Sequence, residues 1–153
     1  MIQRVQTLWL LAVLILQSLI WFLPFASFSM ASGQDLNVAL QSLPDTVEGA
    51  FTGYLSLYVC WAIAVLSALI GIFLFKKRRQ QMKLCVYGMI SSALFAIFAW
   101  ITGFKLADAT QAELHMGSSL SLFMPVLSLL CFVLALRYIR KDEALIKSLD
   151  RLR

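Results

Sequence analysis

Four long apolar runs without an internal charge constrain the fold of this chain more than any other feature. They occupy residues of about 5–25, 54–75, 84–104 and 120–139, roughly half of the 153 residues. A helix rises about 1.5 Å per residue, so each run can cross the roughly 30 Å of hydrocarbon in a bilayer. We therefore expect an all-α membrane protein, an antiparallel bundle of four transmembrane helices in a single membrane domain.

The overall composition excludes several classes of protein. Apolar residues make up 61% of the chain and charged residues only 14%, whereas an ordinary soluble domain has about 25% charged residues. A soluble globule, a disordered chain, a nucleic-acid-binding domain and a disulfide-stapled secreted module are all incompatible with these proportions.

The basic residues gather on one side of the expected topology. Twelve of the thirteen Lys and Arg residues lie before the first run, between the second and third runs, or near and after the end of the fourth. Lys105 is the exception, and it shares its side with five of the eight acidic residues. Because Lys and Arg favour the cytoplasmic side of a membrane, both termini are predicted to be cytoplasmic.

The N-terminal run could also be taken for a signal peptide, because Ser29, Met30 and Ala31 follow it. Its apolar part is about 20 residues long, which exceeds the usual signal core of about 7–15 residues. We therefore expect the run to be retained as the first span.

The longer of the two expected outer loops, residues 26–52, has two interpretations. Leu36, Val38 and Leu40 alternate with polar or small residues, which favours a strand in a short hairpin. Leu36, Leu40 and Leu43 also share one helical face, which favours a short surface helix. The second outer loop, at about residues 105–117, is shorter and polar.

The connection between the second and third runs is short and basic. A short connection predicts that these two spans are antiparallel neighbours. Basic residues at this level attract anionic lipid headgroups. The candidate headgroup contacts are Lys76, Lys77, Arg78, Arg79 and Lys83.

The expected cytoplasmic tail, residues 140–153, has the pattern of an amphipathic helix. Its apolar stripe consists of Leu145, Ile146, Leu149 and Leu152. The helix of the fourth span is expected to run on into this tail or to bend onto the membrane surface. The stripe is either an interfacial anchor or a docking surface for a partner.

Few residues within the expected spans could take part in chemistry. Cys60, Cys85 and Cys131 lie at different depths and are expected to be small packing residues. His115 is a lone histidine in a polar loop, which predicts no metal site. No catalytic, phosphate-binding or dinucleotide motif is present. We therefore expect no enzyme activity, no catalytic residues and no cofactor.

Gln17 is the most polar residue inside a span and a candidate for an interhelical polar contact. Its amide needs a partner in hydrocarbon, which Ser91, Ser92 or Ser128 could supply. No ionisable residue lies inside a span, which argues against a proton relay or a coupled pump. Pro125 is expected to kink the fourth span.

Small residues recur at a spacing of four within the second and third runs. The pairs are Ser67 with Gly71 and Gly88 with Ser92. This spacing lets membrane helices approach closely, within the bundle or between two copies.

Three stretches of the chain resemble one protein family. They are the start MIQRVQT (residues 1–7), the segment FLFKKR (residues 73–78) and the end RYIRKDEALIKSLDRLR (residues 137–153). The chain is similar over its whole length to the bacteroidete four-helix integral membrane proteins of unknown function. The resemblance implies an uncharacterised multi-pass protein of the bacterial inner (cytoplasmic) membrane. It supplies no activity and no functional residues.

Two hypotheses for the function follow. The first is a non-catalytic accessory or scaffold subunit of an inner-membrane complex, which rests on the absence of catalytic motifs and on the patterned tail. The alternative is a membrane protein that binds lipid or a small apolar molecule, which rests on the Pro125 kink and the basic connection. The expected partners are membrane lipids, another inner-membrane protein or a second copy of the chain, and no nucleic acid.

Overall fold

The computed structural model describes residues 3–29, 35–41, 50–74, 77–110, 113–114 and 123–151. Four helices dominate these residues: α1 (Gln3–Phe22), α2 (Ala50–Phe73), α3 (Arg78–Thr110) and α4 (Phe123–Arg151). Three short strands accompany them: β1 (Pro24–Ser29), β2 (Asp35–Ala39) and β3 (Glu113–Leu114).

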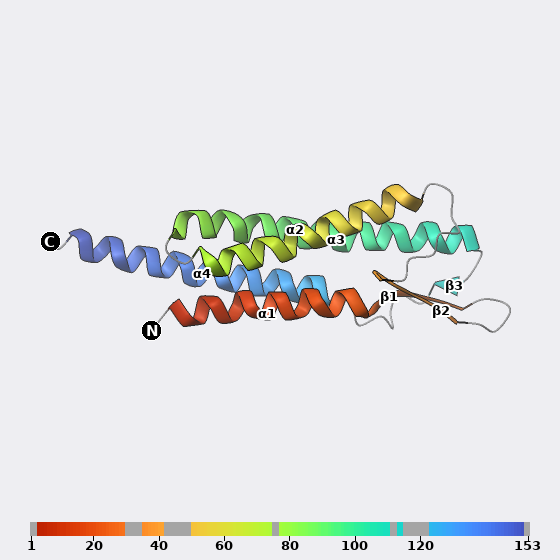
Figure 1. The fold of residues 1–153 in the computed structure, drawn as a ribbon, viewed down its shortest axis with the longest axis horizontal. Coiled ribbons are helices and arrows are strands. Elements are labelled where there is room, and N and C mark those ends of the chain that lie inside the picture. The colour runs from red at the N-terminus through yellow and green to blue at the C-terminus, as the bar shows by residue number, and fades with distance from the viewer. Residues whose placement is uncertain are drawn as a thin grey trace.

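The four helices form an elongated antiparallel bundle (Figure 1). Neighbours pack in a ring, in which α2 contacts α3, α3 contacts α4, α4 contacts α1, and α1 contacts α2. Both chain ends and the α2–α3 turn lie at one end, which we call the basic end, and the strands lie at the other, the sheet end (Figure 1). The expected bundle of four helices is confirmed.

The exposed surface of the helices differs from that of a soluble protein. Large apolar side chains are exposed along all four helices, whereas the buried set includes nine polar or charged side chains. All four helices are long and apolar enough to cross a membrane. Because exposed apolar surface of this extent is stable only against lipid, the structure indicates a multi-pass membrane protein.

Local sequence explains where the helices begin and end. Pro24 follows α1, and the residue before a proline is disfavoured in a helix, so α1 closes with the bond from the Leu23 amide to the Leu19 carbonyl, 2.9 Å. At the α2–α3 turn, the Lys77 carbonyl accepts from the amides of Gln80 (3.0 Å) and Gln81 (3.1 Å), which starts α3.

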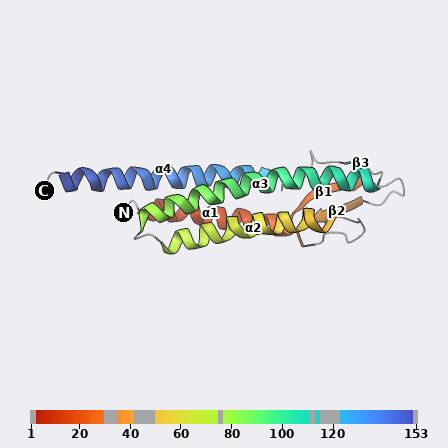
Figure 2. The ribbon, with the colours of Figure 1, turned by 90° about the horizontal axis from the view of Figure 1, so that it is seen from above.

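Two helices are longer than the spans expected from sequence. α3 has 33 residues and begins inside the basic connection at Arg78. It ends at Thr110, so it takes up part of the expected second outer loop, residues 105–117. α4 has 29 residues and runs on along the long axis of the bundle beyond the other helices (Figure 2). Of the two alternatives for the tail, the continuous helix is therefore the one observed.

In its described residues, the first outer loop contains the hairpin alternative, with Leu36 and Val38 in a strand. β1 pairs antiparallel with β2, with Ser27 opposite Asn37, and also with β3, which gives the strand order β2-β1-β3. Val38 and Leu40 are buried at the sheet end, packed with Ile20 and Leu57 in one apolar cluster. The small sheet is thus the one part of the described chain that departs from the all-α expectation.

Pro125, at which a kink is expected, lies near the start of the described part of α4. Pro125 is the third residue of α4, which begins at Phe123. First-turn amides have no partner within the helix, so a proline there removes no helical hydrogen bond and disturbs no preceding turn. The buried Pro125 therefore lies in the first turn of the described part of α4.

Candidate functional site

The described residues hold no obvious reactive centre. No group of three or more His, Cys, Asp or Glu side chains among them could hold a metal ion. Cys60, Cys85 and Cys131 are free and buried. His115 lies outside the described residues. The described residues form three polar sites: a layer in the middle of the bundle, a buried cluster at the basic end, and a groove beside that cluster.

The middle layer is centred on Gln17. Its Nε2 atom donates to the hydroxyl oxygens of Ser92 and Ser128, each at 3.3 Å. The Ser128 hydroxyl lies 2.8 Å from the Pro125 carbonyl oxygen, to which it donates. Trp61 Nε1 donates to the Gln17 carbonyl at 2.9 Å. These contacts join all four helices, and the polar groups of the layer are hydrogen-bond partners of one another. The layer is therefore a structural element rather than a binding site.

The polar cluster at the basic end is less well satisfied. Gln6 Nε2 donates to the Asp142 carboxylate, and the two residues are only 4% and 5% exposed. Gln81 Nε2 donates to the Gly71 carbonyl oxygen at 3.0 Å. Among the described residues, three buried atoms of this end find no hydrogen-bond partner: Trp9 Nε1, Gln81 Oε1 and Asp142 Oδ1.

Asp142 is the residue that sequence reasoning missed, because it was counted with the solvated tail. Its position nevertheless continues the buried face of α4, three residues after Ile139 and seven after Ala135. Arg78 Nη1 donates to the Asp142 main-chain carbonyl at 3.0 Å, which holds the start of α3 against α4. Extending the helical periodicity of the fourth span by one turn would have found it.

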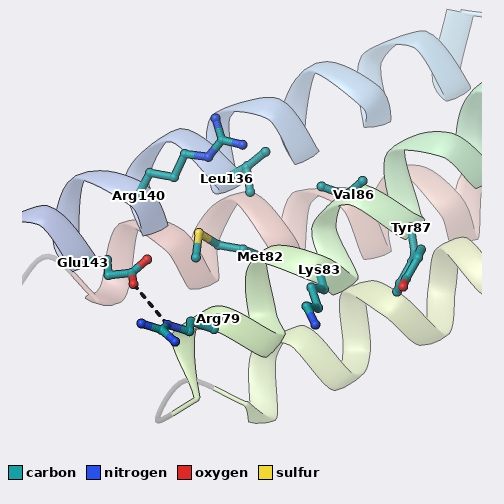
Figure 3. Close-up of a pocket in the computed structure, with 8 residues that line it drawn as sticks. All are labelled: Arg79, Met82, Lys83, Val86, Tyr87, Leu136, Arg140 and Glu143. Carbon is teal, nitrogen blue, oxygen red and sulfur yellow. Dashed lines mark ion pairs between the residues drawn. The ribbon is translucent and has the colours of Figure 1, made fainter.

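A groove with a volume of about 720 Å³ runs between α3 and α4 at the basic end (Figure 3). This volume lies within the range of about 300–1,000 Å³ that is usual for small-molecule sites. The groove is lined by Arg79, Met82, Lys83, Val86, Tyr87, Leu136, Arg140 and Glu143. Three cations and one carboxylate give the lining a net charge of plus two.

The polarity of the groove changes along its length. Arg79 and Glu143 lie nearest the basic end, and they point toward each other from α3 and α4 (Figure 3). Val86, Tyr87 and Leu136 lie deeper along the same two helices, next to their exposed apolar surface. A charged mouth that leads onto an apolar wall matches the shape of an amphiphile, which has a polar head and an apolar chain.

One ion pair crosses the groove. Arg79 Nε lies 3.7 Å from Glu143 Oε1, and the two side chains are 82% and 20% exposed. Lys83 and Arg140 stand on opposite sides of Met82, so the cations surround the groove rather than meeting at one point (Figure 3).

The five cations expected to contact headgroups do not share one environment. Arg79 and Lys83 line the groove. Arg78 is turned to the Asp142 carbonyl, and Lys77 is exposed at the turn. Lys76 lies outside the described residues. Arg140, which sequence reasoning placed only in the tail, supplies the cation on the α4 side of the groove.

The apolar stripe of the tail is only partly described. Leu145 and Ile146 are exposed on α4. Leu149 belongs to α4, but its side chain lies outside the described part of the chain, as does Leu152 altogether.

A smaller cavity of about 440 Å³ also touches α4. It is lined by Leu134, Arg137, Tyr138 and Lys141. None of these residues is shared with the larger groove.

Comparison with known proteins gives a family but no activity. No curated protein and no solved structure matches this chain. One family profile does match, over residues 2–152, and its description assigns no function. Because the match covers nearly the whole chain, this protein belongs to the family described as domain of unknown function DUF4293.

Proposed function

We propose that this protein is a non-catalytic membrane protein that binds an acidic phospholipid in the groove between α3 and α4. The observation that carries the proposal is the polarity of that groove, whose mouth holds Arg79, Lys83 and Arg140 and whose wall is apolar. A lipid phosphate would lie near Lys83 and Arg140, and its acyl chains would follow Val86 and Leu136 toward the bilayer centre.

The electrostatics of the basic end support this choice. Anionic lipids attract clustered Lys and Arg near the membrane surface, by about 1 kcal/mol for each basic residue. The apolar wall adds van der Waals contact with the acyl chains, which already lie in hydrocarbon, so the charged mouth supplies most of the preference. Both contributions act on the same molecule only when the ligand is amphiphilic.

The proposed location follows from the same charges. We place the basic end in the cytoplasm and the protein in the inner (cytoplasmic) membrane of a bacterium of the bacteroidete type. Asn37 and Lys77 are exposed at opposite ends of the bundle and offer a matched test. In spheroplasts, an impermeant maleimide should label Asn37→Cys, whereas Lys77→Cys should react only after lysis. Labelling of Lys77→Cys in intact spheroplasts would contradict the proposed orientation and place the basic end outside the cytoplasm.

Native mass spectrometry of the detergent-purified protein tests the lipid site. Lys83→Gln with Arg140→Gln removes two cations from the groove, and Arg137→Gln with Lys141→Gln removes two cations from the smaller cavity on the same helix end. We expect the first pair to lose most of the retained phosphatidylglycerol and the second pair to keep it. Equal loss of phosphatidylglycerol in both double variants would mean that surface charge in general retains the lipid. That result would contradict a specific lipid site in the groove.

The projecting end of α4 favours a second candidate function, an accessory or scaffold subunit of an inner-membrane complex. α4 extends beyond the other helices and exposes Leu145 and Ile146 (Figure 2). If this amphipathic end docks a partner, Leu145→Glu with Ile146→Glu should release a stoichiometric partner while the protein stays in the membrane fraction. Retention of that partner would show that the end of α4 does not form the interface with it.

A further inference from the structure

The groove contains a carboxylate of its own, which an acidic ligand would have to meet. Glu143 lines the mouth beside three cations and faces Arg79 across it (Figure 3). Its side chain is only 20% exposed, so the carboxylate lies against the groove rather than out in solvent. A site that binds only by positive charge would gain nothing from such a residue.

The ion pair that Glu143 makes is weak by its geometry. The distance of 3.7 Å between Arg79 Nε and Glu143 Oε1 is longer than a hydrogen bond, and the Arg79 side chain is 82% exposed. Exposed pairs of this kind contribute only about 0.2–1 kcal/mol. An incoming phosphate could therefore replace the carboxylate at Arg79 at little cost.

We infer that Glu143 is a specificity-determining residue of the groove: it occupies Arg79 when no lipid is bound and yields it to an acidic headgroup. This inference rests on the proposed lipid site. Lys83 and Arg140 then supply the permanent positive charge, and Arg79 becomes a third contact only for a headgroup that outcompetes Glu143. Because phosphatidylglycerol carries a net negative charge and phosphatidylethanolamine does not, the Glu143 carboxylate lowers the preference of the groove for phosphatidylglycerol.

The experiment measures both lipids on the same protein. The full chain is placed in nanodiscs of equal parts phosphatidylglycerol and phosphatidylethanolamine, extracted in mild detergent, and the retained lipids are quantified by native mass spectrometry. Glu143→Gln should raise the ratio of phosphatidylglycerol to phosphatidylethanolamine about two- to fivefold through more retained phosphatidylglycerol, with retained phosphatidylethanolamine unchanged, which corresponds to the loss of a weak competing pair. Arg79→Gln combined with Glu143→Gln should cancel this gain.

A matched control removes the same charge elsewhere. Asp108 is exposed on α3 toward the sheet end, so Asp108→Asn changes the net charge equally and should leave the ratio unchanged. Thermal unfolding of each variant shows whether the fold is intact, and Glu143→Asp serves as a second, conservative variant that should keep the ratio of the unchanged protein.

Each other outcome has its own meaning. A fall in retained phosphatidylethanolamine in Glu143→Gln would show that the carboxylate binds the amine, which overturns the inference. An unchanged ratio in Glu143→Gln, with phosphatidylglycerol still lost in Lys83→Gln with Arg140→Gln, would overturn the inference and leave the lipid site standing. Retention that is indifferent to Lys83 and Arg140 would instead contradict the lipid site itself.

Discussion

Gln17 on α1 donates a hydrogen bond of 3.3 Å to the hydroxyl of Ser128 on α4, although the two residues are 111 positions apart in the chain. Both side chains are buried, and an apolar cluster lies on either side of them along the bundle. The bond fixes how α1 is placed along α4, because a shift of either helix by one turn would leave the amide against hydrocarbon.

Replacement of Gln17 by Leu should lower the free energy of unfolding by about 1 kcal/mol, the size usual for a polar contact between membrane helices. Ser128→Ala should cost less, because the Gln17 amide keeps its contact with Ser92. Thermal unfolding in detergent, followed by circular dichroism, measures both. A larger loss in Ser128→Ala than in Gln17→Leu would show that Gln17 is not the centre of the layer.

The buried pair of Gln6 and Asp142 should behave as a unit. Gln6→Leu alone leaves the carboxylate without a donor, which should cost at least about 1–3 kcal/mol. The double variant Gln6→Leu with Asp142→Leu removes both polar groups, and it should recover most of that loss because no buried charge remains. A double-mutant cycle on unfolding midpoints checks this. Additive losses would mean that the two residues act independently.

Gly88 lies where three helices approach closely. A Cβ atom there would overlap the ring of Phe132 from α4 and lie 2.5 Å from the Ser67 hydroxyl of α2. Gly88→Ala should therefore destabilise the bundle by about 1–3 kcal/mol through overpacking. At Gly71 a Cβ atom would meet only Leu10 at 3.4 Å, so Gly71→Ala is the matched control and should be tolerated. Equal unfolding midpoints for the two variants would show that the helices separate to make room.

Tyr58 ties the hairpin to the bundle. Its hydroxyl donates to the Leu40 carbonyl at 2.7 Å. Tyr58→Phe keeps the ring and removes only that bond, so the amides of β1 and β2 should exchange with deuterium faster while those of α2 and α3 remain protected. Hydrogen exchange with mass spectrometry resolves the two regions. Unchanged exchange in the hairpin would show that the bond from Tyr58 does not anchor it to the bundle.

The helices could be predicted from sequence because a bilayer permits few alternatives. An apolar run of about 20 residues must satisfy its backbone internally, and a helix does so without reference to any other segment. The hairpin was left open, because Leu36 and Leu40 fit both a strand and a helix, and pairing with β1 decided the outcome.

The groove could not be predicted because it depends on how two helices face each other. Lys83 and Arg140 are 57 positions apart, and only the packing of α3 against α4 brings them to one cavity. Asp142 and Arg78 show the same limit, since their charges predicted solvent or lipid contact and their actual contacts lie within the bundle.

The contact between α1 and α4 also bears on how the protein is made. Gln6 and Asp142 are 136 positions apart in the chain. Because α1 is synthesised before α4, Gln6 cannot bind Asp142 until α4 has also been synthesised. Until nearly the whole chain has left the ribosome, the face of α1 that will meet α4 lies against lipid or the insertion machinery. A stalled or shortened chain keeps an unburied Gln6 amide at the basic end of the bundle. That amide distinguishes an unfinished copy from a finished one, and a membrane protease could recognise it.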